Sequence, residues 1–357
     1  MTAPSVLLTV SGAIPSDLDA EVAAGRRPRA DYRVIAEALG ADVVDAPTAV
    51  ERTGRTGLAL HRLAGAGLVL AWYCFRRRRD YDVILTDGEQ VGIPLAVLSK
   101  LTRARRARHV MIVHILSVPK KSLLIRATRA ASEIDLYVVY CSAQRRFLTD
   151  ALGVPPDHIV LSTFMVDTDF FDPGQVDRPQ RRMICSAGLE RRDYPTLMSA
   201  VEGLDVEVVI AAASPWSKRS DSSENEVIPA NVAIRRLDLF ELRDLYADSA
   251  FVVMPLDDVD FQAGITTILE SMSMSRAVIC TRTPGQTDTL EDGVTGVYVP
   301  IGDVGALREA IVSLLHDPER SARLGSAARR WAVANADVRR YAEVLAGAVA
   351  DVSFADD

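Results

Sequence analysis

The chain has 357 residues, a length that favours two domains over a single core. Apolar residues make up 48% of the sequence and charged residues 25%, which excludes disordered and fibrous proteins. The net charge of −7 hides an uneven distribution, because residues 55–130 contain 15 Lys or Arg against 4 Asp or Glu. Such a region attracts phosphorylated acceptors, anionic lipid or nucleic acid, and is equally typical of an ordinary solvated surface.

Compartment and membrane topology follow from cysteine spacing and apolar runs. The four cysteines are scattered singly without a C-x-x-C pair, which indicates buried thiols in a reducing compartment. The first 20 residues lack a basic start, and their apolar run breaks at Ser11-Gly12, so no signal peptide is predicted. His61 and Arg62 interrupt the apolar stretch 58–75, which leaves too few apolar residues to cross a bilayer. We therefore expect a cytoplasmic protein.

One stretch of sequence is compatible with peripheral contact of the protein with a membrane. Residues 64–79, AGAGLVLAWYCFRRRR, are apolar, then aromatic, then basic, as in a helix lying on the inner face of a membrane. A buried helix of an α/β domain explains the same run.

Short β-branched runs alternate with segments of helical period along the whole chain, which predicts parallel sheets covered by helices on both faces. This pattern occurs twice, so the fold class is α/β with two Rossmann-like, doubly wound domains. The predicted strands are Val6–Val10, Asp42–Val44, Val83–Thr86, His109–Val113, Leu136–Tyr140 and Ile159–Ser162, then Met183–Ala187, Val206–Ala211, Val232–Arg235, Phe251–Pro255, Ala277–Thr281 and Val297–Val299.

The polar segment 172–181, with two prolines and a glycine, is the predicted linker. It separates an N-terminal domain, 1–171, from a C-terminal domain, 182–337. The last helix, about 338–357, is free to pack back on the first domain. The carboxyl ends of parallel strands bind ligands in such domains, so we expect the two domains to face each other across a cleft.

The segment with the clearest chemistry begins at Gly264-Ile265-Thr266-Thr267, which opens a helix directly after a loop. The free N–H groups and positive end of a helix start can hold a diphosphate. Glu270, in the same helix, would lie at the edge of the cleft and accept hydrogen bonds from two ribose hydroxyls. A capping region with a solvated glutamate is the structural alternative.

The stretch 251–303 resembles the donor-binding segment of retaining family-4 glycosyltransferases of GT-B architecture, through Pro284-Gly285, the run 291–296 and Gly302-Asp303. That family carries two glutamates separated by seven residues. Here the second is Glu270, whereas Gln262 takes the first position. Gln262 can still form a hydrogen bond with a sugar hydroxyl but adds no charge. We therefore expect this departure from the family to affect which sugar is preferred.

The stretch 183–201 resembles the first strand and helix of the family's donor domain. Gly188 corresponds to the glycine that the family has in this segment. Arg192 occupies the position of the family's lysine, where a planar guanidinium suits a diphosphate. Leu189 stands where the family often has an arginine, for which Arg191 is the expected replacement. Two surface cations at a helix start would look the same.

Three further positions follow from the resemblance. Leu237 and Asp238 correspond to the loop whose backbone groups hold the nucleobase. In the first domain Gly12 follows the first strand, where the family has a glycine loop facing the donor phosphate. His114 follows another strand, where the family often has a histidine near the sugar. The alternatives are an ordinary turn at Gly12 and a purely structural role for His114.

The resemblance implies a glycosyltransferase that moves a sugar from a nucleoside diphosphate sugar to an acceptor hydroxyl with retention. His114, Gln262, Glu270 and Arg192 are the expected catalytic residues. Asp258-Val-Asp260 spells the metal motif of an unrelated glycosyltransferase fold, but we expect no metal and no cofactor. We also expect no nucleic-acid partner, and the acceptor can be a small molecule, a glycan or a lipid-linked compound. A nucleotide-sugar 2-epimerase and a non-catalytic sugar-nucleotide-binding protein remain as alternatives.

Overall fold

The computed structural model describes residues 3–103, 107–117, 119–212 and 228–353. The chain forms two compact units. The first contains residues 1–19, 30–163 and 339–357, and the second contains residues 20–29 and 164–338. The segment predicted as a linker, 172–181, belongs to the second unit, and almost all of the last helix belongs to the first.

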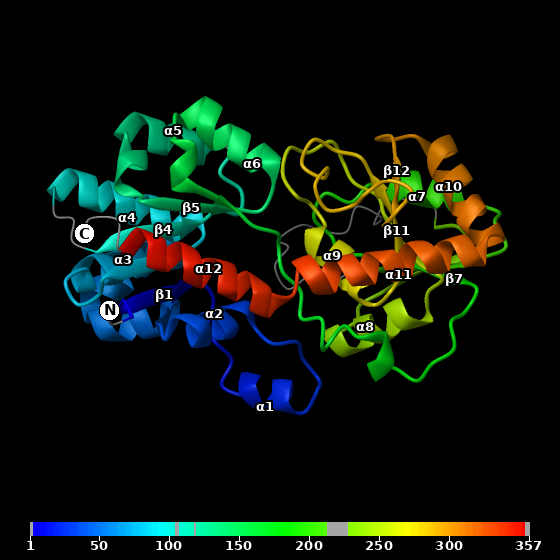
Figure 1. The fold of residues 1–357 in the computed structure, drawn as a ribbon, viewed down its shortest axis with the longest axis horizontal. Coiled ribbons are helices and arrows are strands. Elements are labelled where there is room, and N and C mark those ends of the chain that lie inside the picture. The colour runs from blue at the N-terminus through cyan, green and yellow to red at the C-terminus, as the bar shows by residue number, and fades with distance from the viewer. Residues whose placement is uncertain (1–2, 104–106, 118, 213–227, 354–357) are drawn as a thin grey trace. The chain divides into compact units, whose positions relative to one another are not determined.

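The first unit is built on a six-stranded, all-parallel sheet in the order β2-β1-β3-β4-β5-β6 (Figure 1). Its strands are β1 Val6–Val10, β2 Asp42–Asp45, β3 Val83–Asp87, β4 Arg108–Ile112, β5 Leu136–Val139 and β6 Ile159–Leu161. Its helices are α2 Asp31–Leu39, α3 Ala46–Arg77, α4 Glu89–Thr102, α5 Pro119–Thr128, α6 Ser142–Arg146 and α12 Val338–Ser353, with short turns Ala130–Glu133, Phe147–Ala151 and Pro156–His158. The short helix α1, Leu18–Ala23, lies where the chain passes between the units.

The second unit repeats this plan with the order β12-β11-β10-β7-β8-β9, again all parallel. Its strands are β7 Met183–Ala187, β8 Glu207–Ala211, β9 Val232–Arg235, β10 Phe251–Met254, β11 Ala277–Thr281 and β12 Val297–Val299. Its helices are α7 Tyr194–Val201, α8 Leu239–Asp248, α9 Ile265–Ser273, α10 Val304–His316 and α11 Pro318–Asn335, with a short turn Pro173–Gln175.

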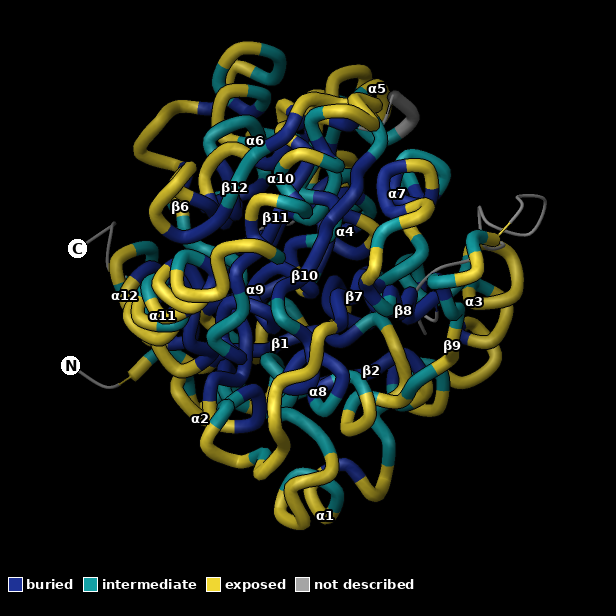
Figure 2. The backbone as a smooth tube through the Cα atoms, turned by 90° about the vertical axis from the view of Figure 1, so that its right-hand side faces the viewer, coloured by how far each residue is buried: buried dark blue, intermediate teal, exposed yellow. Residues whose placement is uncertain are grey.

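The predicted architecture is confirmed. All twelve strands form where the sequence predicts them, with ends that differ by at most one residue. Figure 2 shows the reason, since the central strands are buried while the outer turns of the helices are exposed. In the second unit two apolar clusters cover the two faces of the sheet, because successive side chains of a strand point to opposite sides: Cys185 belongs to one cluster and Ile184 to the other.

Helix α3 decides between the two interpretations of the run 64–79. Val69, Leu70 and Cys74 are fully buried in the core of the first unit, so the buried helix is correct for this part. Among the described residues α3 alone is long and apolar enough to cross a membrane, judged by length and composition, and 33% of its most apolar window is buried. Gly54 and Gly65 have positive φ, however, and divide it into shorter helical segments.

Candidate functional site

The second unit places two loops together at its topological switch point. The chain runs outward from β7 in one direction and from β10 in the other, and these two strands are neighbours. Ligands of open α/β sheets bind at the carboxyl ends of the strands where the order reverses. The loops that leave this point are 188–193 after β7 and 255–264 after β10. They contain Gly188, Arg191, Arg192, Gln262 and Gly264 of the predicted site.

Arg192 is fixed at this point by backbone contacts. It forms an isolated antiparallel bridge with Leu256, which ties the two loops together. Its Nε donates to Ala187 O at 2.9 Å and its Nη1 to Glu190 O at 2.6 Å. The residue is only 7% exposed, and burial lowers the pKa of the guanidinium although it remains a cation.

Two glycines make room for this guanidinium. A Cβ on Gly188 would lie 2.4 Å from Arg192 Nη2, and one on Gly264 would lie 3.4 Å from Arg192 Cζ. Both glycines also have positive φ, of 95° and 76° respectively. Gly264 is the N-cap of α9, so the arginine lies beside the start of that helix. A buried cation at a helix N-terminus is an arrangement that suits an oxyanion.

The first turn of α9 presents its backbone rather than its side chains. Ile265 and Thr267 are buried, while Thr266 is exposed. The first amides of a helix have no partner inside that helix, so those of Thr266 and Thr267 can donate to a ligand. No side chain caps this end of α9.

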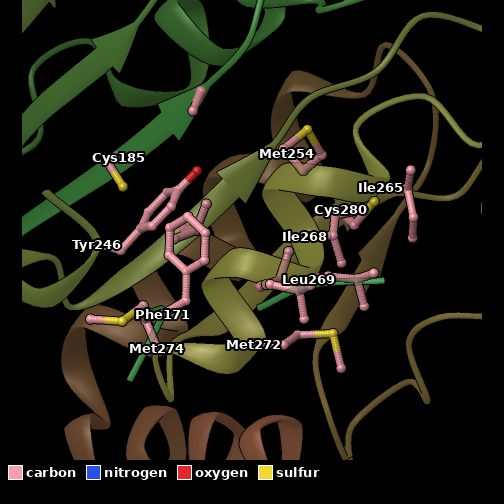
Figure 3. Packing of buried hydrophobic residues seen from close by; sticks show 14 of the residues in the cluster. Phe171, Cys185, Tyr246, Met254, Ile265, Ile268, Leu269, Met272, Met274 and Cys280 are labelled. Carbon is pink, nitrogen blue, oxygen red and sulfur yellow. The ribbon is translucent and has the colours of Figure 1, made fainter. Parts of the chain in front are cut away.

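Glu270 is buried, not at an open edge as the sequence suggested. Glu270 is only 5% exposed, and its Oε2 accepts a hydrogen bond of 2.9 Å from the hydroxyl of Tyr246 in α8. Burial raises the pKa of this carboxyl to about 8, although the bond from Tyr246 favours the charged form. Figure 3 shows Tyr246 beside Phe171 and Cys185, close to α9, so the partner of Glu270 is itself locked in the core.

Gln262 lies in a neutral polar group between two loops. Its Nε2 donates to Thr289 Oγ1 at 3.5 Å, and the two loops are joined by the bond from Gln286 Nε2 to Ala263 O. Within the described chain the buried Oε1 atoms of Gln262 and Gln286 accept no hydrogen bond. These two carbonyl oxygens therefore keep unused capacity to accept hydrogen bonds.

Other predicted positions have structural roles. Leu189 packs against the apolar cluster on one face of the second sheet, and Arg191 adopts a positive φ of 57° with its Nη1 4.0 Å from Asp257. Leu237 is partly buried against the other cluster. Asp238 forms a capping box with Glu241 at the start of α8, so its side chain and its amide are both occupied.

The metal motif Asp258-Val-Asp260 has both carboxylates exposed. Across the described residues, no group of three or more His, Cys, Asp or Glu side chains is arranged to hold a metal ion.

In the first unit the predicted histidine lies at the carboxyl edge of the sheet. His114 follows β4, and its Nε2 is 2.8 Å from Oδ1 of Asp87, the last residue of the neighbouring strand β3. Burial lowers the pKa of the imidazole, but the hydrogen bond and charge of Asp87 outweigh it, so the net shift is upward. Gly12 lies after β1 in an open position, with no atom within 4 Å of the place of a Cβ.

Comparison with known proteins now names the family. A family described as "Glycosyl transferases group 1" matches residues 191–317, which include Arg192, Gly264 and Glu270. A GDP-mannose-dependent alpha-(1-6)-phosphatidylinositol monomannoside mannosyltransferase of Mycolicibacterium smegmatis is 27% identical over 293 residues, 71% of this chain and 74% of that protein. Over residues 191–317 the chain is a group 1 glycosyltransferase.

Solved structures support the fold of this glycosyltransferase along its whole length. Anabaena HepE in complex with UDP-glucose has a TM-score of 0.70 at 14% identity, covering 98% of this chain and all of the other. Sucrose-phosphate synthase of Thermosynechococcus elongatus has a TM-score of 0.72 at 17% identity, with 99% and 100% covered. The fold is GT-B. The enzyme is a retaining transferase of family 4 that uses a nucleotide sugar, so the epimerase and the non-catalytic protein are set aside.

Sequence reasoning missed the acidic residues around His114 in this glycosyltransferase. Glu89, only 2% exposed, accepts the backbone N–H groups of His114 and Ile115, each at 3.0 Å. Asp31 begins α2 and interacts electrostatically with both Asp87 and His114. Asp87 could have been found, because it directly follows the predicted strand Val83–Thr86, at the same edge of the sheet as His114. Asp31 and Glu89 carry no such signal, since helix starts with acidic residues are common.

Proposed function

We propose that the donor diphosphate binds the second unit at the start of α9, held by Arg192 and the amides of Gly264 to Thr267. The observation that carries this proposal is the buried guanidinium of Arg192 beside Gly264 at the switch point. Transfer builds negative charge on the departing diphosphate. A fixed cation and oriented amides stabilise that charge without reorganising, and removal of one such donor typically costs about 10²–10³ in kcat.

Further roles follow the family pattern in this proposal. Glu270 holds the ribose of the nucleotide, with Tyr246 orienting its carboxyl. Gln262 binds a hydroxyl of the transferred sugar through its unpartnered Oε1, and His114 contributes from the first unit. Gly188 leaves space for Arg192, Gly12 approaches the ligand, and the Leu237 backbone contacts the base. Arg191, half exposed, supplies additional positive charge to the donor.

Thermal stabilisation by nucleotides tests the donor site. A panel of GDP-, UDP- and dTDP-sugars, with GDP-mannose first because of the mycobacterial relative, is added to the wild-type protein and to Arg192→Gln. A ligand present at 100 times its Kd stabilises by about 2.7 kcal/mol, which gives a clear rise in melting temperature. The loss of charge-assisted hydrogen bonds in the variant is expected to weaken binding about 10- to 100-fold.

Two controls keep this test decisive. Arg182→Gln changes an exposed arginine of the same unit and should leave the stabilisation intact. Arg192→Lys keeps the charge and restores the residue that the family has at this position, so stabilisation is expected to persist in it even if Arg192→Gln fails to fold. If Arg192→Gln folds and responds to every nucleotide sugar as the wild type does, the diphosphate does not bind at Arg192.

A second part of the proposal concerns the acceptor, for which we favour a lipid-linked compound at a membrane surface. The mycobacterial relative is named for a phosphatidylinositol mannoside acceptor. In this chain Leu63 is 83% exposed, Leu101 76% and Leu123 68%, and they lie on α3, α4 and α5 of the first unit. Helix α4 packs against both of the others. Exposed leucines among basic residues are typical of a surface that binds anionic lipid.

The middle segment of α3, residues 55–64, combines exposed leucines and exposed arginines on this surface. Leu58 and Leu63 are exposed on it together with Arg55 and Arg62, between the breaks at Gly54 and Gly65. It directly precedes the run 64–79, in which residues 69–71 and 73–75 are buried. A peripheral helix of this kind gains about 1 kcal/mol for each basic residue near an anionic membrane.

Vesicle sedimentation tests the lipid surface separately from the donor. Wild-type protein should sediment with phosphatidylinositol-containing vesicles and much less with pure phosphatidylcholine, and salt should weaken the binding. Leu58→Ser with Leu63→Ser should reduce it severalfold. Ile301→Ser, at an exposed apolar position of the second unit, is the control. Equal sedimentation of the double variant and the control would reject this surface but leave the donor site untouched.

A further inference from the structure

The loop after β11, residues 282–290, lies against the loop after β10. The two strands are parallel neighbours, so both loops leave the same edge of the second sheet. Gly285 donates its N–H to Val259 O at 3.3 Å. The two backbones touch beside this bond, because a Cβ on Gly285 would lie 2.1 Å from Phe261 O, and a glycine permits that approach. The contact fixes the position of the second loop along the first.

Gln286, the next residue, reaches the end of the neighbouring loop with its side chain. Its Nε2 donates to Ala263 O at 2.9 Å, and the residue is fully buried. A backbone carbonyl can only accept a hydrogen bond, so the group that faces it is the NH2 of the amide. Ala263 is the residue before Gly264, the N-cap of α9. The side chain of Gln286 therefore holds the peptide that leads into this helix.

That peptide connects the carbonyl held by Gln286 to an amide of the proposed donor site. The oxygen of Ala263 and the N–H of Gly264 belong to one planar peptide group, which is trans. In a trans peptide the C=O and N–H bonds point in opposite directions, so fixing the carbonyl also fixes the N–H. Within the described residues the N–H of Gly264 has no hydrogen-bond partner. It points away from the amide of Gln286 and is free to donate to an anion.

The same contact bears on a second amide. If α9 continued toward its N-terminus, Ala263 O would accept from the N–H of Thr267, four residues along the chain. In the described part of the chain Ala263 O accepts from Gln286 instead, and Gly264 O accepts the first bond of this kind, from Ile268 N–H at 3.0 Å. The N–H of Thr267 is left without a helical partner. Gln286 thus influences both ends of the run of amides at 264–267.

Packing alone does not explain an amide at position 286. The Oε1 of Gln286 is buried and, among the described residues, accepts no hydrogen bond. A buried acceptor without a donor destabilises a protein, whereas a methionine of similar length would fill the space without this penalty. What the amide adds is its bond to Ala263 O. The other side-chain bond between these loops is longer, since Gln262 Nε2 lies 3.5 Å from Thr289 Oγ1.

We propose that Gln286 is a positioning residue of the donor site, which aims the N–H groups of Gly264 and Thr267 at the diphosphate before the ligand binds. This inference rests on the proposed function, because that function places the diphosphate at these amides. It gives the loop after β11 control over a helix start that follows the loop after β10. Donors that are oriented in advance stabilise developing negative charge without reorganising, so Gln286 should matter for transfer as well as for binding.

Gln286→Met tests the proposal, because it removes the donor and keeps the length of the side chain. The wild type and the variant are titrated with GDP, UDP and dTDP and with the corresponding nucleosides. The variant should bind the accepted nucleoside diphosphate about 10-fold more weakly, because bonds to a charged group are misdirected. It should bind the nucleoside as the wild type does. Its kcat, measured as transfer or as donor hydrolysis, should fall about 10- to 100-fold.

Gln180→Met is the matched control in the same unit. Gln180 Nε2 also donates to backbone carbonyls, those of Ser249 and Ala250 at 3.0 and 3.2 Å, just before the start of β10. This variant should keep the affinity for the nucleoside diphosphate and the kcat of the wild type. Equal losses in both variants would mean a general effect on the unit and would overturn the positioning role of Gln286.

NMR on the wild type supplies a test that needs no variant. Addition of the accepted nucleoside diphosphate should shift the backbone amide signals of Gly264 and Thr267. The side-chain NH2 signals of Gln286 should stay in place, because its bond to Ala263 O exists before the ligand binds. Movement of the Gln286 signals together with unchanged backbone signals would show that this side chain does not orient the amides.

The outcomes separate this inference from the proposed function. If the wild type binds none of the three nucleoside diphosphates, the proposed donor site is wrong and the inference fails with it. If the wild type binds one of them, and the folded Gln286→Met variant binds it equally well with an unchanged kcat, the donor site stands and the role of Gln286 alone is refuted.

Discussion

The two units share one strand plan but build opposite surroundings at the carboxyl edges of their sheets. The second unit offers a buried guanidinium, glycines and the amides of a helix start, all of which favour an anion. The first offers carboxylates around one imidazole, whose negative charge disfavours an anion. A common fold therefore does not decide what binds; the loops at the strand ends do. Substitutions in the two units can test how far this contrast holds.

The largest effect is expected from Gly264→Ala in the second unit. The residue has φ of 76°, and an added Cβ would lie 2.7 Å from Met254 Sδ in the core. A positive φ costs a non-glycine residue about 1–3 kcal/mol, and the methionine must also move. Chemical denaturation should show this loss, and nucleotide stabilisation should fall as well.

Gly302→Ala is the matched control for that substitution. Gly302 also has a positive φ, of 66°, in the same unit, but no atom lies within 4 Å of its Cβ position. It should lose stability through the backbone alone and keep its response to nucleotides. If both variants bind nucleotide sugars like the wild type, Gly264 does not shape the donor site.

Glu270→Gln should have a smaller effect that depends on pH. The carboxyl has a pKa of about 8 in the folded protein and near 4.5 when unfolded, so the unfolded state binds fewer protons between these values. Stability contributed by this group therefore falls as the pH rises from 4.5 to 8. The variant should gain a few degrees in melting temperature at pH 8 relative to wild type, by about 2–4 °C for each kcal/mol, and little at pH 4.5.

The measurement is a pair of thermal melts at the two pH values, with Glu202→Gln as an exposed control in the same unit. A gain that is the same at both pH values would mean that Glu270 is ionised in the folded protein. In that case the second unit would hold a buried anion next to its donor site, and the contrast with the first unit would weaken.

The smallest effect is expected from Tyr140→Phe in the first unit. Its hydroxyl pairs with that of Tyr341 at 3.0 Å, and both residues are buried. Loss of one partner should cost about 1 kcal/mol in denaturant unfolding. The double variant with Tyr341→Phe should lose less than the sum of the two single variants, because they remove the same bond. Additive losses would show that the two hydroxyls do not interact.

The strands were predictable from the sequence because buried parallel strands are short apolar runs separated by polar turns. Arg192 and Gly264 could be found because each lies in a continuous motif. The buried state of Glu270 could not, since it depends on Tyr246 in another helix. Asp31 and Glu89, near His114, were missed for the same reason, because only the fold of the first unit brings them close to that histidine. The breaks in α3 at Gly54 and Gly65 were also missed, because isolated glycines are often tolerated inside helices.

The order in which the chain contributes to the two units has a consequence for its synthesis. Residues 20–29 join the second unit, and the first unit receives residues 339–357 only after the second unit has been translated. Tyr341, the partner of Tyr140, lies in that last segment. A nascent chain on the ribosome can therefore complete the second unit while the first still lacks α12. Until the final helix emerges, the surface that α12 covers stays open to chaperones, and the first unit is the last to mature.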